Sequence, residues 1–124
     1  MKWLLVFLGS GIGGCLRLLT SEIFGKYFGH AYPYGTFISN FLACLLLGLV
    51  LGLFESARML DVRARWLLAV GICGGYSTFS TFSNETLQLF SAQKFVEAFV
   101  YVGASVIIGI ASVFGGFMLV QYFK

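Results

Sequence analysis

The residues best suited to chemistry lie in one stretch, residues 74–85, within an otherwise apolar segment. The stretch opens with two glycines, and five of its other residues are serine or threonine. Such residues are poor formers of a regular helix, and in lipid any backbone group they release must face protein or a polar cavity. Broken membrane helices of this kind supply carbonyls and half-helix ends to ions. We therefore predict an ion-binding break at about residues 75–79; a helix kinked for purely structural reasons is the alternative.

Two phenylalanines lie between these hydroxyl side chains. Phe79 and Phe82 are three residues apart and share one face of a helix, whereas Thr81 and Glu85, four residues apart, share another. A phenyl ring has a positive edge that can meet an anion. Phenylalanine is usually a packing residue, and the chain has fourteen, so only the position of this pair among hydroxyl groups indicates contact with an anion.

Other polar side chains lie within apolar segments elsewhere in the chain. Asn40 offers two amide donors. Tyr101, Ser105 and Ser112 follow at steps of four and seven residues and form one helical stripe. The stripe must face protein or a pore rather than lipid. Hydrogen bonds between helices and the lining of a polar path both remain open for these residues.

Two charged residues lie toward the ends of apolar segments. Arg17 is fourteen residues beyond Trp3, or about 21 Å along a helix. It can anchor the helix at the membrane interface or concentrate anions at an entrance, and the sequence favours neither. Glu85 lies nineteen residues beyond Trp66, and capping, pairing with a cation and taking a proton all remain possible for it.

The composition indicates the elements that carry these residues. The 124 residues are 59% hydrophobic and 10% charged, with a mean hydropathy of +0.91, whereas soluble domains average about 25% charged residues. A soluble enzyme is thereby excluded, and the scattered basic residues form no nucleic-acid-binding face. At about 20 residues per crossing, we expect an all-α membrane protein. Its single transmembrane domain, 1–124, would have four helices at about 3–23, 34–54, 64–91 and 96–122.

The glycines, sixteen in all, indicate close helix packing. Three pairs are four residues apart: Gly9/Gly13, Gly48/Gly52 and Gly71/Gly75. Small residues at this spacing let helices approach closely in lipid. The contacts are expected within the chain, with a second copy, or both. Four helices alone enclose almost no aqueous path, so a transport function indicates at least a dimer.

Catalytic constellations are missing from the sequence. It has no HExxH motif, no P-loop and no Ser-His-Asp set. Its cysteines, Cys15, Cys44 and Cys73, match no zinc-binding spacing. We predict that the protein is not an enzyme.

Three segments together resemble a known family. Residues 71–83, Gly-Ile-Cys-Gly-Gly-Tyr-Ser-Thr-Phe-Ser-Thr-Phe-Ser, closely resemble the signature of the Fluc/CrcB fluoride channels. Residues 35–37 leading to Asn40 resemble the second helix of that family, and the glycine-rich segment ending at Arg17 resembles its first. The resemblance extends over essentially the whole chain.

The sequence departs from the family pattern in three places. Ser77 stands where threonine is usual, Ala43 and Cys44 stand where a Gly-Ser pair is common, and Gly109 stands where some members have a pore-lining serine. The first change is conservative for coordination by the backbone. The last removes part of the polar track expected on the fourth helix.

The resemblance implies an antiparallel, dual-topology homodimer with two fluoride pores. It implies the following pore residues: Asn40, Phe79, Ser80, Thr81, Phe82, Tyr101 and Ser105. Arg17 would lie in a vestibule and Glu85 near the pore. The backbone carbonyls of Gly74 and Ser77 from both subunits would hold a structural sodium ion at the dimer centre, the one cofactor expected. A buried cation needs unwound carbonyls, which the predicted break would supply.

The function implied by the resemblance is passive export of cytoplasmic fluoride by a selective channel in the bacterial inner membrane, protecting the cell from fluoride toxicity. Its partners would be a second copy, fluoride and the lipid bilayer, with no nucleic acid. The alternative is a small proton-coupled multidrug-type antiporter, which needs a central acid in its first helix, where this chain has none before Glu22. A membrane scaffold without transport is the third possibility.

Overall fold

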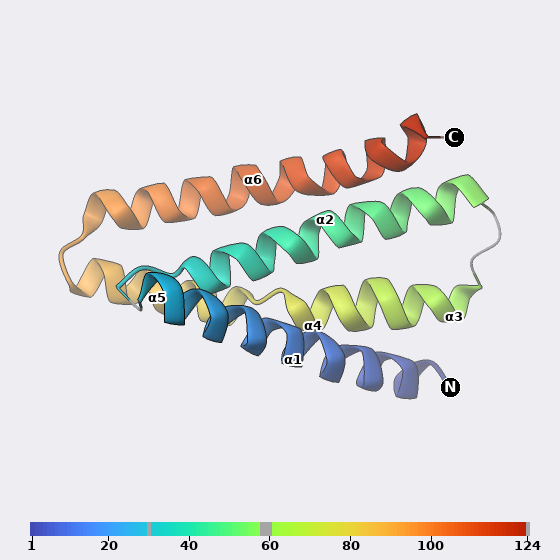
Figure 1. Cartoon of the computed structure of the whole chain (residues 1–124), viewed down its shortest axis with the longest axis horizontal. Helices are drawn as coiled ribbons and strands as arrows, with labels where there is room; N and C mark the ends of the chain where they lie inside the picture. Colours follow the sequence, from blue (N-terminus) through green and yellow to red (C-terminus); the bar gives the residue numbers. More distant parts are fainter. Residues whose placement is uncertain (30, 58–60, 124) are drawn as a thin grey trace.

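The computed structural model of the chain describes residues 1–29, 31–57 and 61–123, and this part is all-α with no strand (Figure 1). Two long helices come first, a row of shorter helical segments follows, and one long helix ends the chain. The elements are α1 (Lys2–Phe28), α2 (Tyr34–Ala57), α3 (Val62–Arg65), the π-helical segment η1 (Trp66–Cys73), α4 (Gly74–Tyr76), α5 (Phe79–Ser91) and α6 (Phe95–Tyr122).

The helices form an elongated up-and-down bundle. α1 and the row from α3 to α5 run in one direction, and α2 and α6 run in the other, so the two ends of the chain lie at the same end of the bundle (Figure 1). Among the described helices α1, α2 and α6 are long and apolar enough to cross a membrane by length and composition, with mean hydropathies of 1.6, 2.4 and 2.1. An all-α membrane protein fits this architecture.

The helices extend beyond the uncharged stretches that were used to predict them. α1 ends at Phe28 rather than at 23, and α2 ends at Ala57 rather than at 54. The predicted ends were set by charge, but a helix ends where its backbone is capped. Gly29, with φ of 73°, terminates α1, and its N–H donates to the Gly25 carbonyl at 2.9 Å.

Glycines bring helix backbones into direct contact at two interfaces. α1 packs on η1, and a Cβ added to Gly9 would lie 2.8 Å from the Gly71 Cα and 2.5 Å from the Leu67 carbonyl oxygen. α2 packs on α6 in the same manner, with Gly48 against the backbone of Val113. The predicted close approach at the spaced glycines is therefore present within a single chain.

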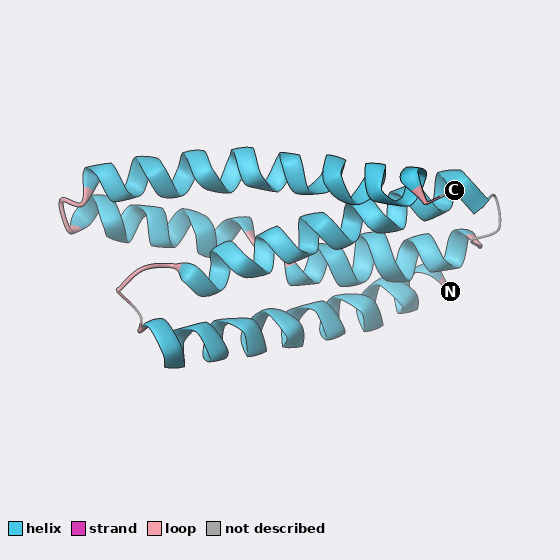
Figure 2. Ribbon diagram, turned by 45° about the horizontal axis from the view of Figure 1, so that its top comes forward, coloured by secondary structure: helices cyan, strands magenta, loops and turns pink. Residues whose placement is uncertain are grey.

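The row of short helices is interrupted between α4 and α5 (Figure 2). Ser77 and Thr78 have extended backbone angles, with φ and ψ of −75° and 154° and of −148° and 121°. The Thr78 side chain accepts a hydrogen bond from the N–H of Thr81 and so caps the start of α5. Helical geometry thus stops and restarts within the hydroxyl-rich stretch, in which side chains compete for the backbone.

Candidate functional site

The side-chain amide of Asn40, on α2, braces the interruption between α4 and α5. Its Oδ1 accepts a hydrogen bond from the Thr78 N–H at 2.7 Å, and its Nδ2 donates to the Thr78 carbonyl at 3.2 Å. Both backbone groups of this extended residue are therefore paired. One of the two amide N–H groups remains for another partner, so Asn40 can hold the interruption and still donate a hydrogen bond.

At the interruption, two backbone N–H groups donate hydrogen bonds to side chains. In a continuous helix they would donate to backbone carbonyls four residues earlier. In an α-helix the N–H of a residue pairs with the carbonyl four residues earlier. The Thr78 N–H, whose helical partner is Gly74, donates to Asn40, and the Thr81 N–H, whose helical partner is Ser77, donates to Thr78 Oγ1 at 3.2 Å. The carbonyls of Gly74 and Ser77 thereby lose their helical donors. Such oxygens fit the ligand preference of a hard cation.

A cluster of hydroxyl groups lies at the start of α5. Thr78 Oγ1 donates to Thr81 Oγ1 at 3.0 Å and lies 3.3 Å from Ser80 Oγ. Thr78 is buried, whereas Ser80 and Thr81 are exposed. The cluster therefore links the buried interruption to the surface of the monomer.

A cavity of about 250 Å³, here called the break cavity, lies beside the interruption and is bordered by α2, α5 and α6. Its lining residues are Asn40, Cys44, Ser77, Thr78, Phe79, Phe82, Ser105, Val106 and Gly109. The ring centroids of Phe79 and Phe82 are 5.7 Å apart. The Ser105 hydroxyl oxygen is buried and has no hydrogen-bond partner within the described part of the chain. None of these lining side chains is charged.

Glu85 joins three helices next to this cavity. Its two carboxylate oxygens accept hydrogen bonds from the hydroxyls of Thr36 at 2.7 Å and Tyr101 at 2.8 Å. The Phe82 ring packs on Tyr101 with centroids 5.2 Å apart. Sequence reasoning singled out Glu85 and Tyr101 but missed Thr36 as their partner. The available signal was spacing, because Thr36 precedes Asn40 by four residues on the same face of α2.

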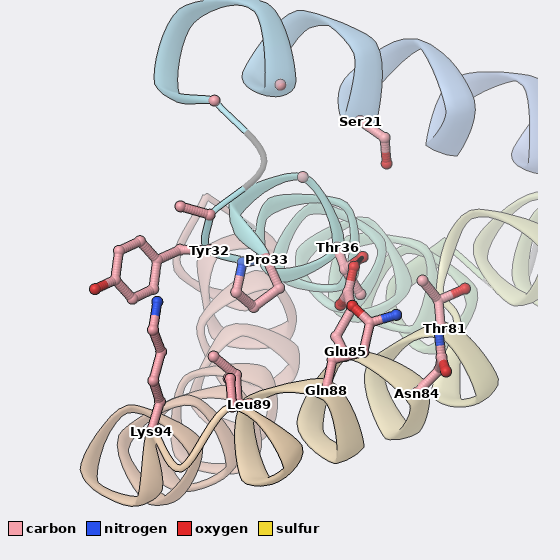
Figure 3. Close-up of a pocket in the computed structure, with 15 residues that line it drawn as sticks. Ser21, Tyr32, Pro33, Thr36, Thr81, Asn84, Glu85, Gln88, Leu89 and Lys94 are labelled. Carbon is pink, nitrogen blue, oxygen red and sulfur yellow. Dashed lines mark hydrogen bonds between the residues drawn. The ribbon is translucent and has the colours of Figure 1, made fainter.

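A second cavity, of about 430 Å³, opens beside Glu85 near the turn from α1 to α2 (Figure 3). A neighbouring cavity of about 540 Å³ is lined by Arg17 and shares Ser21, Thr36 and Thr81 with it. Arg17 therefore lies on the α1 side of the bundle and does not line the break cavity. We call this pair of cavities the entrance cavities.

The family follows from comparison with known proteins. A family model described as "CrcB-like protein, Camphor Resistance (CrcB)" matches residues 4–117 of the chain. The chain belongs to the CrcB family. The resemblance identified from the sequence motifs is thereby confirmed.

Relatives in this family match the chain over nearly its full length. A protein of Phocaeicola vulgatus is 43% identical over 114 residues, covering 91% of this chain and 93% of its own. A protein of Flavobacterium psychrophilum is 38% identical over 116 residues, covering 94% of both chains. A protein of Nitrobacter winogradskyi is 39% identical over 124 residues, covering 98% of both chains. All three are named fluoride-specific ion channel FluC.

The structure separates most of the predicted site residues of this CrcB-family chain into two groups, whereas Gly74 and Ser80 line neither the break cavity nor the entrance cavities. The break cavity gathers Asn40, Phe79, Phe82 and Ser105, whereas Arg17, Thr81 and Glu85 line the entrance cavities. Tyr101 connects the groups through its contacts with Phe82 and Glu85.

The far end of the predicted α6 stripe is not available to this site. Ser112 is buried, and its hydroxyl donates to the Ile108 carbonyl of its own helix at 2.6 Å. Ser105 is thus the stripe residue with a free hydroxyl beside the break cavity.

Proposed function

We propose that this protein is a fluoride-selective channel, not an enzyme, through which the ion passes by electrodiffusion. The break cavity carries the proposal, because phenyl rings, an amide and hydroxyls line it and none of its lining side chains is charged. Membership in the CrcB family and relatives named fluoride-specific ion channels support it.

Fluoride is small and strongly hydrated, so its path must replace water without trapping the ion. The free amide N–H of Asn40, the Ser105 hydroxyl and the ring edges of Phe79 and Phe82 are weak donors suited to this task. A lysine or arginine in the same cavity would hold the anion more tightly. Weak donors instead let fluoride bind and leave.

The entrance cavities complete the proposed path. Arg17 raises the local concentration of anions. Thr81 lines both entrance cavities, and the hydroxyls of Thr81 and Ser80 lie 3.0 Å and 3.3 Å from Thr78 Oγ1 beside the break cavity. Glu85 lines one entrance cavity, and the Tyr101 hydroxyl holds its carboxylate in place by a hydrogen bond. A negative-inside potential, about 2.3 kcal/mol per charge per 100 mV, drives the anion out of the cell and so protects the cell from fluoride.

We further propose an antiparallel, dual-topology homodimer with two pores. Phe79 is 79% exposed in the single chain, and no atom outside the local backbone of Gly74 lies within 4 Å of a Cβ built at that residue. A second copy would cover both positions and enclose a path that one bundle leaves open. The carbonyls of Gly74 and Ser77 from both copies are the ligands we propose for a structural sodium ion, which would supply a fixed positive charge at the dimer centre.

The row from α3 to α5 is the fourth membrane crossing in this proposal. Its η1 and α4 part packs along α1, a helix long enough to cross, and the interruption at Ser77 and Thr78 falls toward the middle of the row (Figure 2). That position supports a break near the bilayer centre. The bacterial relatives and the helical architecture support a place in the bacterial inner membrane.

The antiporter alternative is not favoured by the structure. The only acid on α1 is Glu22, which is exposed near the end of that helix. Glu85, the remaining candidate for proton exchange, already accepts hydrogen bonds on both carboxylate oxygens.

Ion efflux from liposomes that contain the purified protein tests the proposed function. We expect fluoride efflux to exceed chloride efflux by at least about a hundredfold, equivalent to about 2.7 kcal/mol. Phe79→Ile removes one ring edge and should slow fluoride by about tenfold or more. Equal rates for chloride and fluoride would contradict selectivity, and no flux of either ion would support a scaffold.

A further inference from the structure

The phenol of Tyr76, the last residue of α4, forms a buried hydrogen bond with α1. Its hydroxyl lies 2.9 Å from Thr20 Oγ1, and both residues are only 8% exposed. Thr20 donates its own hydroxyl proton to the Leu16 carbonyl at 2.9 Å, so the Tyr76 hydroxyl is the donor in the bond between the two side chains. Neither residue lines the break cavity or the entrance cavities.

The Tyr76 side chain extends along α1 toward the interruption. α4 packs on α1 through its backbone, and a Cβ added to Gly13 would lie 2.6 Å from the Tyr76 nitrogen. Thr20 is seven residues farther along α1, or about 10 Å, and the row of short helices runs in the same direction as α1 (Figure 1). The phenol therefore reaches in the direction in which the chain leaves helical geometry at Ser77.

Ser77 thus lies between two anchored neighbours. Tyr76 before it is bonded to α1 through its hydroxyl, and Thr78 after it is bonded to α2 through the amide of Asn40. Both neighbours are buried, whereas Ser77 is half-buried and Gly74 is exposed in the single chain. The anchors therefore lie inside the bundle and leave at its surface the two residues whose carbonyls have lost their helical donors.

The two anchors together set the direction of the Ser77 carbonyl. The peptide bond between Ser77 and Thr78 is trans, so its C=O and its N–H point in opposite directions. Because the Thr78 N–H points at Asn40, the Ser77 carbonyl points away from that side chain. The Ser77 N–H donates to the Cys73 carbonyl at 3.0 Å, so the orientation of Ser77 also depends on where the end of α4 is held.

We propose that Tyr76 is a positioning residue for the structural sodium ion. Its hydrogen bond to Thr20 holds the end of α4, so that the carbonyls of Gly74 and Ser77 keep the arrangement that a cation requires. This inference rests on the proposed function, since it takes these two carbonyls as sodium ligands. Ligands act together only when each is held within about 0.5 Å of its productive position. Without the bond, the residue next to Ser77 is free to turn.

The test is the sodium concentration that gives half of the maximal rise in melting temperature of the purified protein in detergent. Ionic strength is kept constant with N-methylglucamine as the replacing cation. We expect Tyr76→Phe, which removes only the hydroxyl, to need at least about threefold more sodium than the wild-type protein. Tyr27→Phe makes the same chemical change on an exposed side chain of α1 and should need the wild-type concentration.

A double variant separates positioning from plain stabilisation. Thr20→Val leaves the buried Tyr76 hydroxyl without an acceptor and should lower the melting temperature in the absence of sodium. Combining it with Tyr76→Phe removes both polar groups while nearly keeping their shapes, so the melting temperature should largely recover. The raised sodium requirement should persist in this double variant, whereas Thr20→Ser, which keeps the acceptor, should retain the wild-type requirement. Recovery of both properties together in the double variant would overturn the positioning role.

Failure of this inference and failure of the proposed function give different results. A wild-type protein that sodium stabilises, with Tyr76→Phe needing the same sodium concentration, would overturn the role of Tyr76 alone. A wild-type melting temperature that does not respond to sodium would overturn the sodium site and the positioning role with it. Absence of fluoride efflux from proteoliposomes of the same wild-type preparation would overturn the proposed channel, while the sodium measurements still decide the role of Tyr76.

Discussion

The row of short helices has two halves, η1 with α4 before the interruption and α5 after it, and different physical interactions hold each half to the bundle. η1 and α4 lie against α1 through backbone contacts at glycines, such as Gly9 with Gly71. α5 is held by hydrogen bonds from α2 and α6, through Asn40 to Thr78 and through Tyr101 to Glu85. Apolar burial does not drive helix association in lipid. The packing of the first half therefore depends on the small size of its glycines, and that of the second half on hydrogen bonds between polar groups.

The largest loss of stability is expected from Asn40→Ala. The change leaves the N–H and the carbonyl of Thr78 without partners, and each unpaired group costs about 1–3 kcal/mol. We expect the free energy of unfolding in detergent to fall by about 3 kcal/mol, and the fluoride rate to fall as well.

Asn40→Asp is the matched comparison, because it keeps an acceptor for the Thr78 N–H but not a donor for its carbonyl. Asn40→Asp should recover part of the stability that Asn40→Ala loses. Its negative charge should repel fluoride and keep the fluoride rate low. Equal stability of Asn40→Ala and wild type would show that Asn40 does not brace the interruption.

Gly9→Ala tests the glycine-packed half. Its Cβ would meet the Gly71 Cα at 2.8 Å, so helices must separate, at a cost of about 2 kcal/mol. Gly11→Ala, on the same helix with nothing within 4 Å, should be neutral or slightly stabilising. Thermal unfolding of both variants checks the difference, and indistinguishable melting temperatures would contradict the close packing of α1 on η1.

Tyr101→Phe should have a smaller effect on α5. It removes one hydrogen bond to Glu85 but keeps the aromatic contact with Phe82. We expect a loss of about 1.5 kcal/mol in unfolding free energy. The same change in a Thr36→Val background should cost less, because both hydroxyls donate to one carboxylate. Strict additivity in this double-mutant cycle would argue against a coupled network.

The smallest effect is expected at the cap of α5. Thr78→Val removes the hydroxyl that accepts from the Thr81 N–H and should cost about 1 kcal/mol. Thr78→Ser restores that hydroxyl and should recover most of the loss in chemical denaturation. Failure of serine to recover stability would assign the effect to the shape of the side chain instead.

The sequence predicted where helical geometry is interrupted before α5 better than it predicted the contacts of α5. The hydroxyl-rich stretch predicted an interruption at about residues 75–79, and Ser77 and Thr78 are the residues that leave helical geometry. This could be predicted because serine and threonine side chains compete locally for backbone hydrogen bonds. Thr36 was missed, although its spacing of four residues from Asn40 places both on one face of α2; that its partner is Glu85 follows only from the packing of α2 on α5.

The ends of the helices and the hydrogen bonds of Asn40 to Thr78 could also not be predicted from the sequence. Charge marks where apolar sequence stops, but α1 continues to Phe28 until Gly29 closes it. The amide of Asn40 was interpreted as a donor to an ion, whereas in the fold it first pairs with Thr78. A long-range hydrogen bond of this kind leaves no periodic pattern in the sequence.

The position of both chain ends at one end of the bundle (Figure 1) limits how two copies can be joined genetically. A short flexible tether between the last residues of one copy and Met1 of the next would force the pair to insert the same way up. To join two copies that are inserted in opposite orientations, the tether would instead need to contain one membrane-spanning segment. Tandem fusions with and without such an added segment would therefore report on orientation directly, through whether the joined polypeptide still conducts.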